Sequence, residues 1–236
     1  MRPVLRGAWP QKNGQDIQFK EYSEARAELI RRLGEYCSYC EMHLDSSLAV
    51  EHVKPKKPSG SSTVDQTRDL NWNNFLLACV NCNSAKGNTD VKINDYFWAD
   101  RDNTFLVFQY SEGGRILPAS HLNEELMKKA KATIELAGLD KQPLNDSSAS
   151  DRRWENRREA WDIAVDSKAD LAQNDTPQMR RQIVRSVRGY WSTWMTVFKD
   201  DPDMLQRLIR AFPGTCESCF DAGNGYLPIP RPEEQV

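Results

Sequence analysis

The hydrophobic pattern changes character near the middle of the chain. Before residue 120 the apolar positions form short runs: residues 48–53 and 74–78 have the pattern of strands, and residues 105–110 and 115–117 flank a Ser-Glu-Gly-Gly turn typical of a hairpin. One short helix is predicted at residues 23–33, where Ala25, Leu29 and Leu33 recur and Gly34 follows. The first 20 residues show no strong period and suggest an irregular arm.

After residue 120 the pattern becomes helical. Residues 123–137, 151–172, 177–198 and 203–212 are predicted to be helices, separated by Gly138, a Pro/Asn/Ser stretch at 143–149, and residues 174–176. The end of the chain, residues 223–236, is rich in proline and acidic side chains and is expected to be extended. The sequence therefore predicts an α+β protein, with a domain of residues 1–120 followed by a mainly α-helical region of residues 121–236.

Charge and composition narrow the possible functions. The 236 residues include 32 basic and 34 acidic side chains, so the net charge of -2 provides no overall attraction to a polyanion. Any attraction to nucleic acid must therefore come from a local group of basic residues. The longest apolar run, residues 75–80, is far shorter than the ~20 residues that cross a bilayer, and no signal-like apolar segment begins the chain. We expect a cytoplasmic protein that makes no membrane contact.

The cysteines suggest a metal site. All six lie in three Cys-x-x-Cys pairs, and 38 residues separate the first pair from the second. Two such pairs present four thiolates to one ion, which favours a closed, structural Zn²⁺ site over disulfides. The predicted ligands are Cys37, Cys40, Cys79 and Cys82. The alternatives are buried or redox-active thiols and a substitution of His43 for one cysteine. The third pair, Cys216 and Cys219, is interpreted as reduced thiols, with an intersubunit or redox role as the alternative.

The interval between the two pairs holds a second set of polar residues. It is too long for a simple zinc ribbon and contains Glu51-His52 near a strand end and Asn74 before the second pair, while Asn83 and Lys86 follow that pair. Cys-Ser-Tyr-Cys, Glu-His-Val-Lys-Pro, Asn-Phe-Leu-Leu-Ala-Cys and Cys-Asn-Ser-Ala-Lys-Gly together resemble HNH endonucleases of the ββα-metal type. The motif core spans residues 37–87, inside an N-terminal domain that adds the arm and the hairpin.

The resemblance implies a role for each polar residue in phosphodiester hydrolysis. His52 would be the general base, because a neutral imidazole accepts a proton from water. Glu51 and Asn83 would bind the catalytic cation, and their oxygen donors favour Mg²⁺ or Mn²⁺. Asn74 would orient the base, while Lys54 and Lys86 would hold phosphates of the substrate.

The same motifs resemble, more specifically, the HNH subunits of retron and Septu-type anti-phage systems. That resemblance implies an ABC/SMC-like ATPase partner, a retron reverse transcriptase with its DNA as a further component, and a nucleic-acid substrate, DNA or structured RNA. Two other functions stay open: a non-catalytic zinc adaptor that binds an ATPase or nucleic acid, and a Cys-x-x-Cys thiol oxidoreductase with an exposed cysteine of low pKa.

Overall fold

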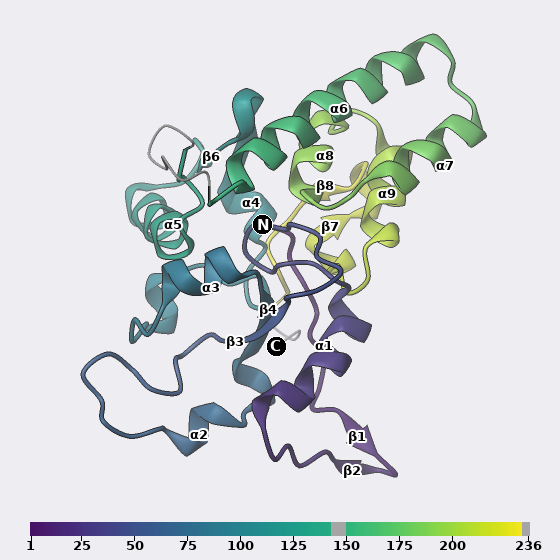
Figure 1. Ribbon diagram of the computed structural model, residues 1–236. Helices are drawn as coiled ribbons and strands as arrows, with labels where there is room; N and C mark the ends of the chain where they lie inside the picture. The colour runs from purple at the N-terminus through teal and green to yellow at the C-terminus, as the bar shows by residue number, and fades with distance from the viewer. Residues whose placement is uncertain (143–149, 233–236) are drawn as a thin grey trace.

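A two-stranded antiparallel sheet followed directly by a helix organises the N-terminal part of the protein. The computed structural model describes residues 1–142 and 150–232. In it, β3 (Ala49–His52) pairs with β4 (Phe75–Ala78), with Val50 opposite Leu77 and His52 opposite Phe75 (Figure 1). The helix α3 (Val80–Lys86) begins two residues after β4 and packs against β3. All of β4 is buried, since the apolar run there is covered on both faces.

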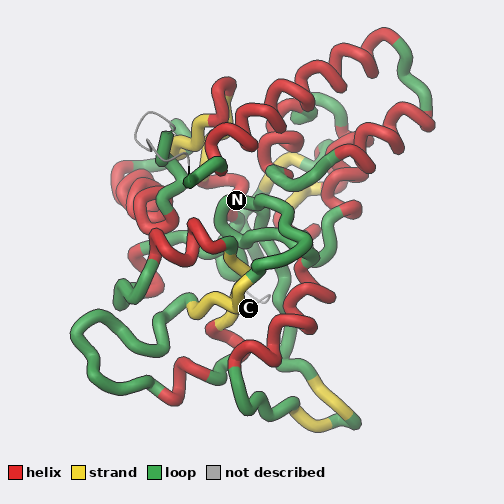
Figure 2. Tube along the Cα trace, viewed as in Figure 1, coloured by secondary structure: helices red, strands yellow, loops and turns green. Residues whose placement is uncertain are grey.

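Short elements surround this ββα unit. The strands form antiparallel pairs, and loops make up much of the rest of the N-terminal part (Figure 2). The elements up to residue 118 are β1 (Gln11–Lys12), β2 (Gln15–Asp16), η1 (Tyr22–Ala25), α1 (Arg26–Leu33), α2 (Gln66–Asp69), η2 (Trp72–Asn74), η3 (Ile93–Asp95), α4 (Thr104–Val107), β5 (Phe108–Ser111), η4 (Glu112–Gly114) and β6 (Arg115–Pro118).

The C-terminal part is mainly helical, as predicted. A long helix, α6, and its neighbour α7 extend away from the rest of the molecule (Figure 1). No helix in the described ranges has both the length and the apolar character needed to cross a membrane. The elements are α5 (Glu124–Ala137), α6 (Arg153–Gln173), α7 (Pro177–Ser186), α8 (Trp191–Val197), α9 (Pro202–Ala211), η6 (Glu217–Cys219), β7 (Phe220–Asp221), η7 (Ala222–Asn224) and β8 (Leu227–Pro228). The predicted break at 143–149 lies outside the described residues.

Two element predictions were wrong in detail. The single helix expected at 177–198 is interrupted, because the chain at Gly189 forms a β-bridge with Met42 and a Cβ there would lie 2.6 Å from the carbonyl oxygen of Glu41. Gly189 has φ +94°, which suits glycine. The strand expected from residue 105 begins at Phe108 instead, since the side chain of Asn103 caps a preceding helical turn.

The N-terminal arm is not a loose extension. Met1 and Val4 are buried, and Val4 forms a β-bridge with Thr215. Arg2 is also buried and donates to the carbonyl oxygens of Leu33 and Pro213. The first residues therefore lie between the N-terminal and C-terminal parts of the chain. The prediction missed this because a strand that pairs through single bridges has no regular period.

Two apolar cores meet across this arm. The first contains buried residues from Met1 to Leu139, including most of the ββα unit, and the second contains residues from Ala164 to Phe220. Helix α5 packs against α3. The first core thus continues past residue 120, where the sequence suggests a domain boundary.

Arg157 of α6 joins the two parts of the chain. Its side chain is 1% exposed, and it donates from Nε to the carbonyl oxygen of Gly114 (2.6 Å) and from Nη2 to that of Leu139 (2.9 Å). These carbonyls lie on either side of residue 120. A buried arginine therefore bonds the long helix to the rest of the fold.

We expect Arg157→Ala to lower the free energy of unfolding by roughly 2–4 kcal/mol, because each orphaned buried acceptor costs about 1–3 kcal/mol. Urea denaturation would measure the change. Its neighbour Arg158 has a side chain 55% exposed, so Arg158→Ala should change stability by less than about 0.5 kcal/mol. Equal effects of the two substitutions would contradict this account of Arg157.

Candidate metal and nuclease site

Four cysteines from two separate segments form one buried cluster. Cys37 and Cys40 follow α1, Cys79 caps the N-terminus of α3, and Cys82 lies in its first turn. Their sulfur atoms lie within 4.8 Å of one another, and Cys40 Sγ lies 3.7 Å from Cys79 Sγ. Four sulfurs bound tetrahedrally at ~2.3 Å from Zn²⁺ would be about 3.8 Å apart. The donor set and spacing fit a structural zinc ion.

The protonation of the cluster also favours a cation. Burial raises the pKa of Cys40 and Cys82, whereas hydrogen bonds from the neighbouring thiols lower the pKa of Cys79. Four thiolates this close repel one another unless a cation lies between them. Because the cysteines are at most 2% exposed, they lack the accessible low-pKa sulfur that a thiol oxidoreductase requires.

An arginine from the C-terminal part contacts this cluster. Arg153 donates from Nη1 to Cys82 Sγ (2.9 Å) and to the carbonyl oxygen of Ala137 (2.8 Å), and from Nη2 to that of Gly138 (2.8 Å). Its side chain is buried and pairs with Asp151. A zinc ion bound by four thiolates has a net charge of -2, which Arg153 partly offsets. No local sequence signal indicates this contact, because the two residues lie 71 positions apart.

His52 lies at the end of β3 in a buried position. The ring is 8% exposed and stands between Tyr22 and Phe75, with centroid distances of 5.0 and 5.2 Å. Its Nε2 lies 2.9 Å from the carbonyl oxygen of Asp69. A carbonyl only accepts hydrogen bonds, so Nε2 bears the proton and Nδ1 of the neutral ring has the free lone pair. Burial lowers the pKa of His52, which favours this neutral form.

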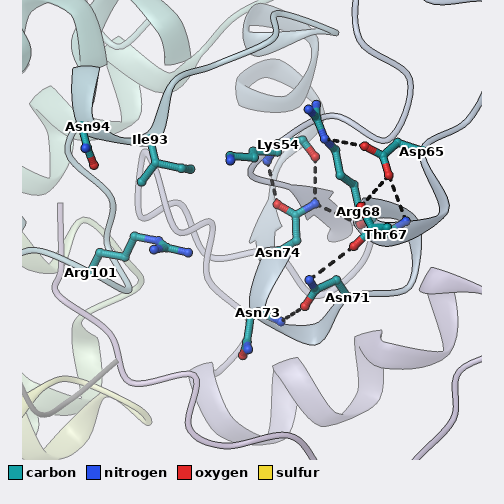
Figure 3. A pocket seen from close by; sticks show the side chains of 10 residues that line it. All are labelled: Lys54, Asp65, Thr67, Arg68, Asn71, Asn73, Asn74, Ile93, Asn94 and Arg101. Carbon is teal, nitrogen blue, oxygen red and sulfur yellow. Dashed lines mark hydrogen bonds and ion pairs between the residues drawn. The ribbon is translucent and has the colours of Figure 1, made fainter.

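Asn74 ties together the backbone around His52. Its Oδ1 accepts from the backbone nitrogen of Lys54 (2.7 Å), and its Nδ2 donates to the carbonyl oxygens of Lys54 (2.8 Å) and Arg68 (3.0 Å), as Figure 3 shows. Lys54 follows His52 by two residues. Arg68 directly precedes Asp69, whose carbonyl oxygen bonds the His52 ring. The amide thus holds both the segment that bears His52 and the segment that bonds the ring.

Glu51 forms a buried ion pair with Lys86. Lys86 Nζ lies 2.7 Å from Glu51 Oε1 and donates to the carbonyl oxygen of His52 (2.8 Å). Burial raises the pKa of Glu51, and the ammonium of Lys86 partly offsets that rise. Lys86 is 1% exposed, and its predicted contact with a substrate phosphate stays a prediction. Its long side chain reaches inward from α3 to pair with the carboxylate.

Three of the expected catalytic residues line one cavity. Glu51, His52 and Asn83 border a space of about 140 Å³, together with Lys56 and Lys86. We call it the His52 cavity. Asn74 and Lys54 instead line a neighbouring space of about 610 Å³, the Asn74 cavity (Figure 3). The sequence missed the backbone carbonyl of Asp69, because a carbonyl carries no residue-specific signal.

The third cysteine pair lies apart from the cluster. Cys216 and Cys219 are buried in the second core, with their sulfurs 3.2 Å apart. A hydrogen bond from Cys219 lowers the pKa of Cys216 to about 6. Within the described ranges, the cluster of Cys37, Cys40, Cys79 and Cys82 is the one group of three or more metal-binding side chains. Among the residues that the structure describes, no third His, Cys, Asp or Glu joins Cys216 and Cys219 in such a group.

We expect Cys79→Ser to abolish zinc binding and to unfold the ββα unit, since structural zinc contributes on the order of 10 kcal/mol in small modules. Elemental mass spectrometry would give the zinc content, and circular dichroism the thermal midpoint. The matched variant Cys216→Ser should keep one zinc ion per chain. A Cys79→Ser protein with unchanged zinc and midpoint would show that the cluster holds no metal.

Comparison with known families agrees with this geometry. Residues 37–89 match the family model described as HNH endonuclease. The matched segment includes the cysteine cluster, both strands of the ββα unit and α3. No curated protein matches the chain. Residues 37–89 therefore carry the segment that the HNH endonuclease model describes, and the rest of the chain lies outside the match.

Proposed function

We propose that this protein is a metal-dependent endonuclease that hydrolyses phosphodiester bonds in nucleic acid. The observation that supports this proposal most directly is the joint placement of Glu51, His52 and Asn83 around one cavity. The HNH match over residues 37–89 points to the same chemistry.

His52 is the proposed general base. The bond from Nε2 to the Asp69 carbonyl selects the tautomer in which Nδ1 accepts a proton from water. Burial keeps the ring neutral near pH 7 by lowering its pKa. Asn74 is a positioning residue, since its three backbone bonds hold the segments on which the ring depends.

Glu51 and Asn83 are the proposed ligands of Mg²⁺ or Mn²⁺. Both offer oxygen donors at the His52 cavity, and the Oε2 atom of Glu51 stays outside the 2.7 Å contact between its Oε1 and Lys86. When bound, the cation stabilises the negative charge that develops on the phosphate and leaving-group oxygens. Lys54 is the proposed phosphate contact of the substrate. Lys86 is proposed to hold the Glu51 carboxylate in place.

We also propose that the nuclease acts in the cytoplasm as the effector of an anti-phage assembly with an ABC/SMC-like ATPase, as the motif resemblance implies. A retron reverse transcriptase with its DNA would be a further component. The net charge of -2 supports a division of labour, since a protein with little attraction for polyanions benefits from a partner that delivers DNA. The extended α6–α7 pair offers a surface for such a partner (Figure 1).

His52→Ala should reduce cleavage by at least about 10²-fold, because general bases contribute on the order of 10²–10⁴ in rate. The assay would use plasmid, single-stranded DNA and total RNA with Mg²⁺, Mn²⁺ or chelator, with and without the ATPase. Chelation should abolish cutting.

His43→Ala is the matched control for that assay. Its side chain is 28% exposed and faces Glu35, outside the His52 cavity, so this variant should cut normally. An undiminished rate in His52→Ala would overturn the proposal. So would a wild-type protein that binds zinc but cuts no substrate under any condition, and that result would identify a zinc adaptor.

A further inference from the structure

The Asn74 cavity has an unusual lining of polar side chains. It lies next to the segment that follows His52, and Asn74 itself forms part of its wall. Figure 3 shows Lys54 and Arg101 reaching from two separate segments toward the same space. Asn73 and Asn94 lie at its border. Their side-chain amides form no hydrogen bond with another described residue.

The cations of this cavity differ in how their charge is balanced. Arg68 is neutralised, because it lies 2.9 Å from Asp65 and 2.7 Å from Asp90. Neither Lys54 nor Arg101 forms an ion pair with any residue in the described part of the chain, and Arg101 Nε is buried without an acceptor. Both side chains are half-buried.

Two partly desolvated cations that face one space repel each other and lose hydration. An anion between them would reverse both costs. The lining has no aromatic ring on which a base would stack, whereas lysine, arginine and amide groups are common partners of phosphate oxygens. The chemistry of the cavity therefore suits a phosphate group.

The position of Lys54 indicates which phosphate this is. It is two residues from His52, so their Cα atoms are at most roughly 7 Å apart. A strand whose scissile phosphate enters the His52 cavity would pass this cavity with a neighbouring phosphate.

We propose that the Asn74 cavity binds a backbone phosphate adjacent to the one that is cut, held by Arg101 together with Lys54. This inference rests on the proposed nuclease function. It assigns Arg101, which no sequence motif marks, to the substrate-contacting surface, and it explains how strand binding proceeds although Lys86 is buried.

The test measures binding in a His52→Ala background, so that the strand stays intact. Fluorescence anisotropy of a labelled DNA oligonucleotide, single- or double-stranded, would give the affinity over a series of salt concentrations. Arg101→Gln should weaken binding and reduce the salt slope by about 0.7–0.9, the value for one phosphate contact. Arg101→Lys should restore most of the slope because it keeps the charge.

Arg115→Gln is the matched control, since Arg115 is exposed on β6 and does not line the cavity. It should leave the affinity and slope unchanged. An Arg101→Gln protein with unchanged affinity and slope would overturn the inference, as would an equal loss in Arg115→Gln. Competition by a mononucleotide as strong as by the oligonucleotide would assign the cavity to free nucleotides and also overturn it.

Failure of this inference is distinguishable from failure of the proposed function. Unchanged cleavage by His52→Ala removes the nuclease assignment whatever Arg101 does. Loss of cleavage in His52→Ala with no effect of Arg101→Gln on binding removes only the phosphate site.

Discussion

The packing of four thiols into one buried cluster is the constraint on which the rest of the structure depends. Cys37 and Cys40 come from the turn after α1, while Cys79 and Cys82 begin α3. A metal ion bound there would join segments that are 38 residues apart in the chain and would fix the start of α3 beside the turn after α1. Because Glu51 and His52 lie on β3 and Asn83 on α3, the packing of α3 against β3 brings the three residues to the His52 cavity.

Buried arginines extend this link to the C-terminal part. Arg153 donates to Cys82 Sγ, and Arg157 one turn later donates to the backbone carbonyl of Gly114 in the N-terminal part. A zinc-thiolate cluster with net negative charge favours a cation beside it, so zinc binding and the docking of α6 are expected to support each other. The helical region is thus bonded to the N-terminal part through charge as well as through apolar packing.

Backbone groups contribute as much as side chains to the position and tautomer of His52. The Asp69 carbonyl sets the tautomer, and Asn74 holds the segments on both sides through backbone bonds. The Glu51–Lys86 pair places a buried positive charge beside the carboxylate. Such a pair costs hydration, and it is stable because both groups also bond the backbone near His52.

Much of the local structure was predictable from the residues alone. The strands at 49–52 and 75–78, the helices α5, α6 and α9 and the cysteine pairs follow from spacing and ligand chemistry, which are properties of neighbouring residues. Four other features could not be predicted from the residues alone. They are the burial of Lys86, the contact of Arg153 with Cys82, the break at Gly189 and the pairing of Val4 with Thr215. Each depends on a group far away in the chain, and only the folded arrangement decides which distant donor meets which acceptor.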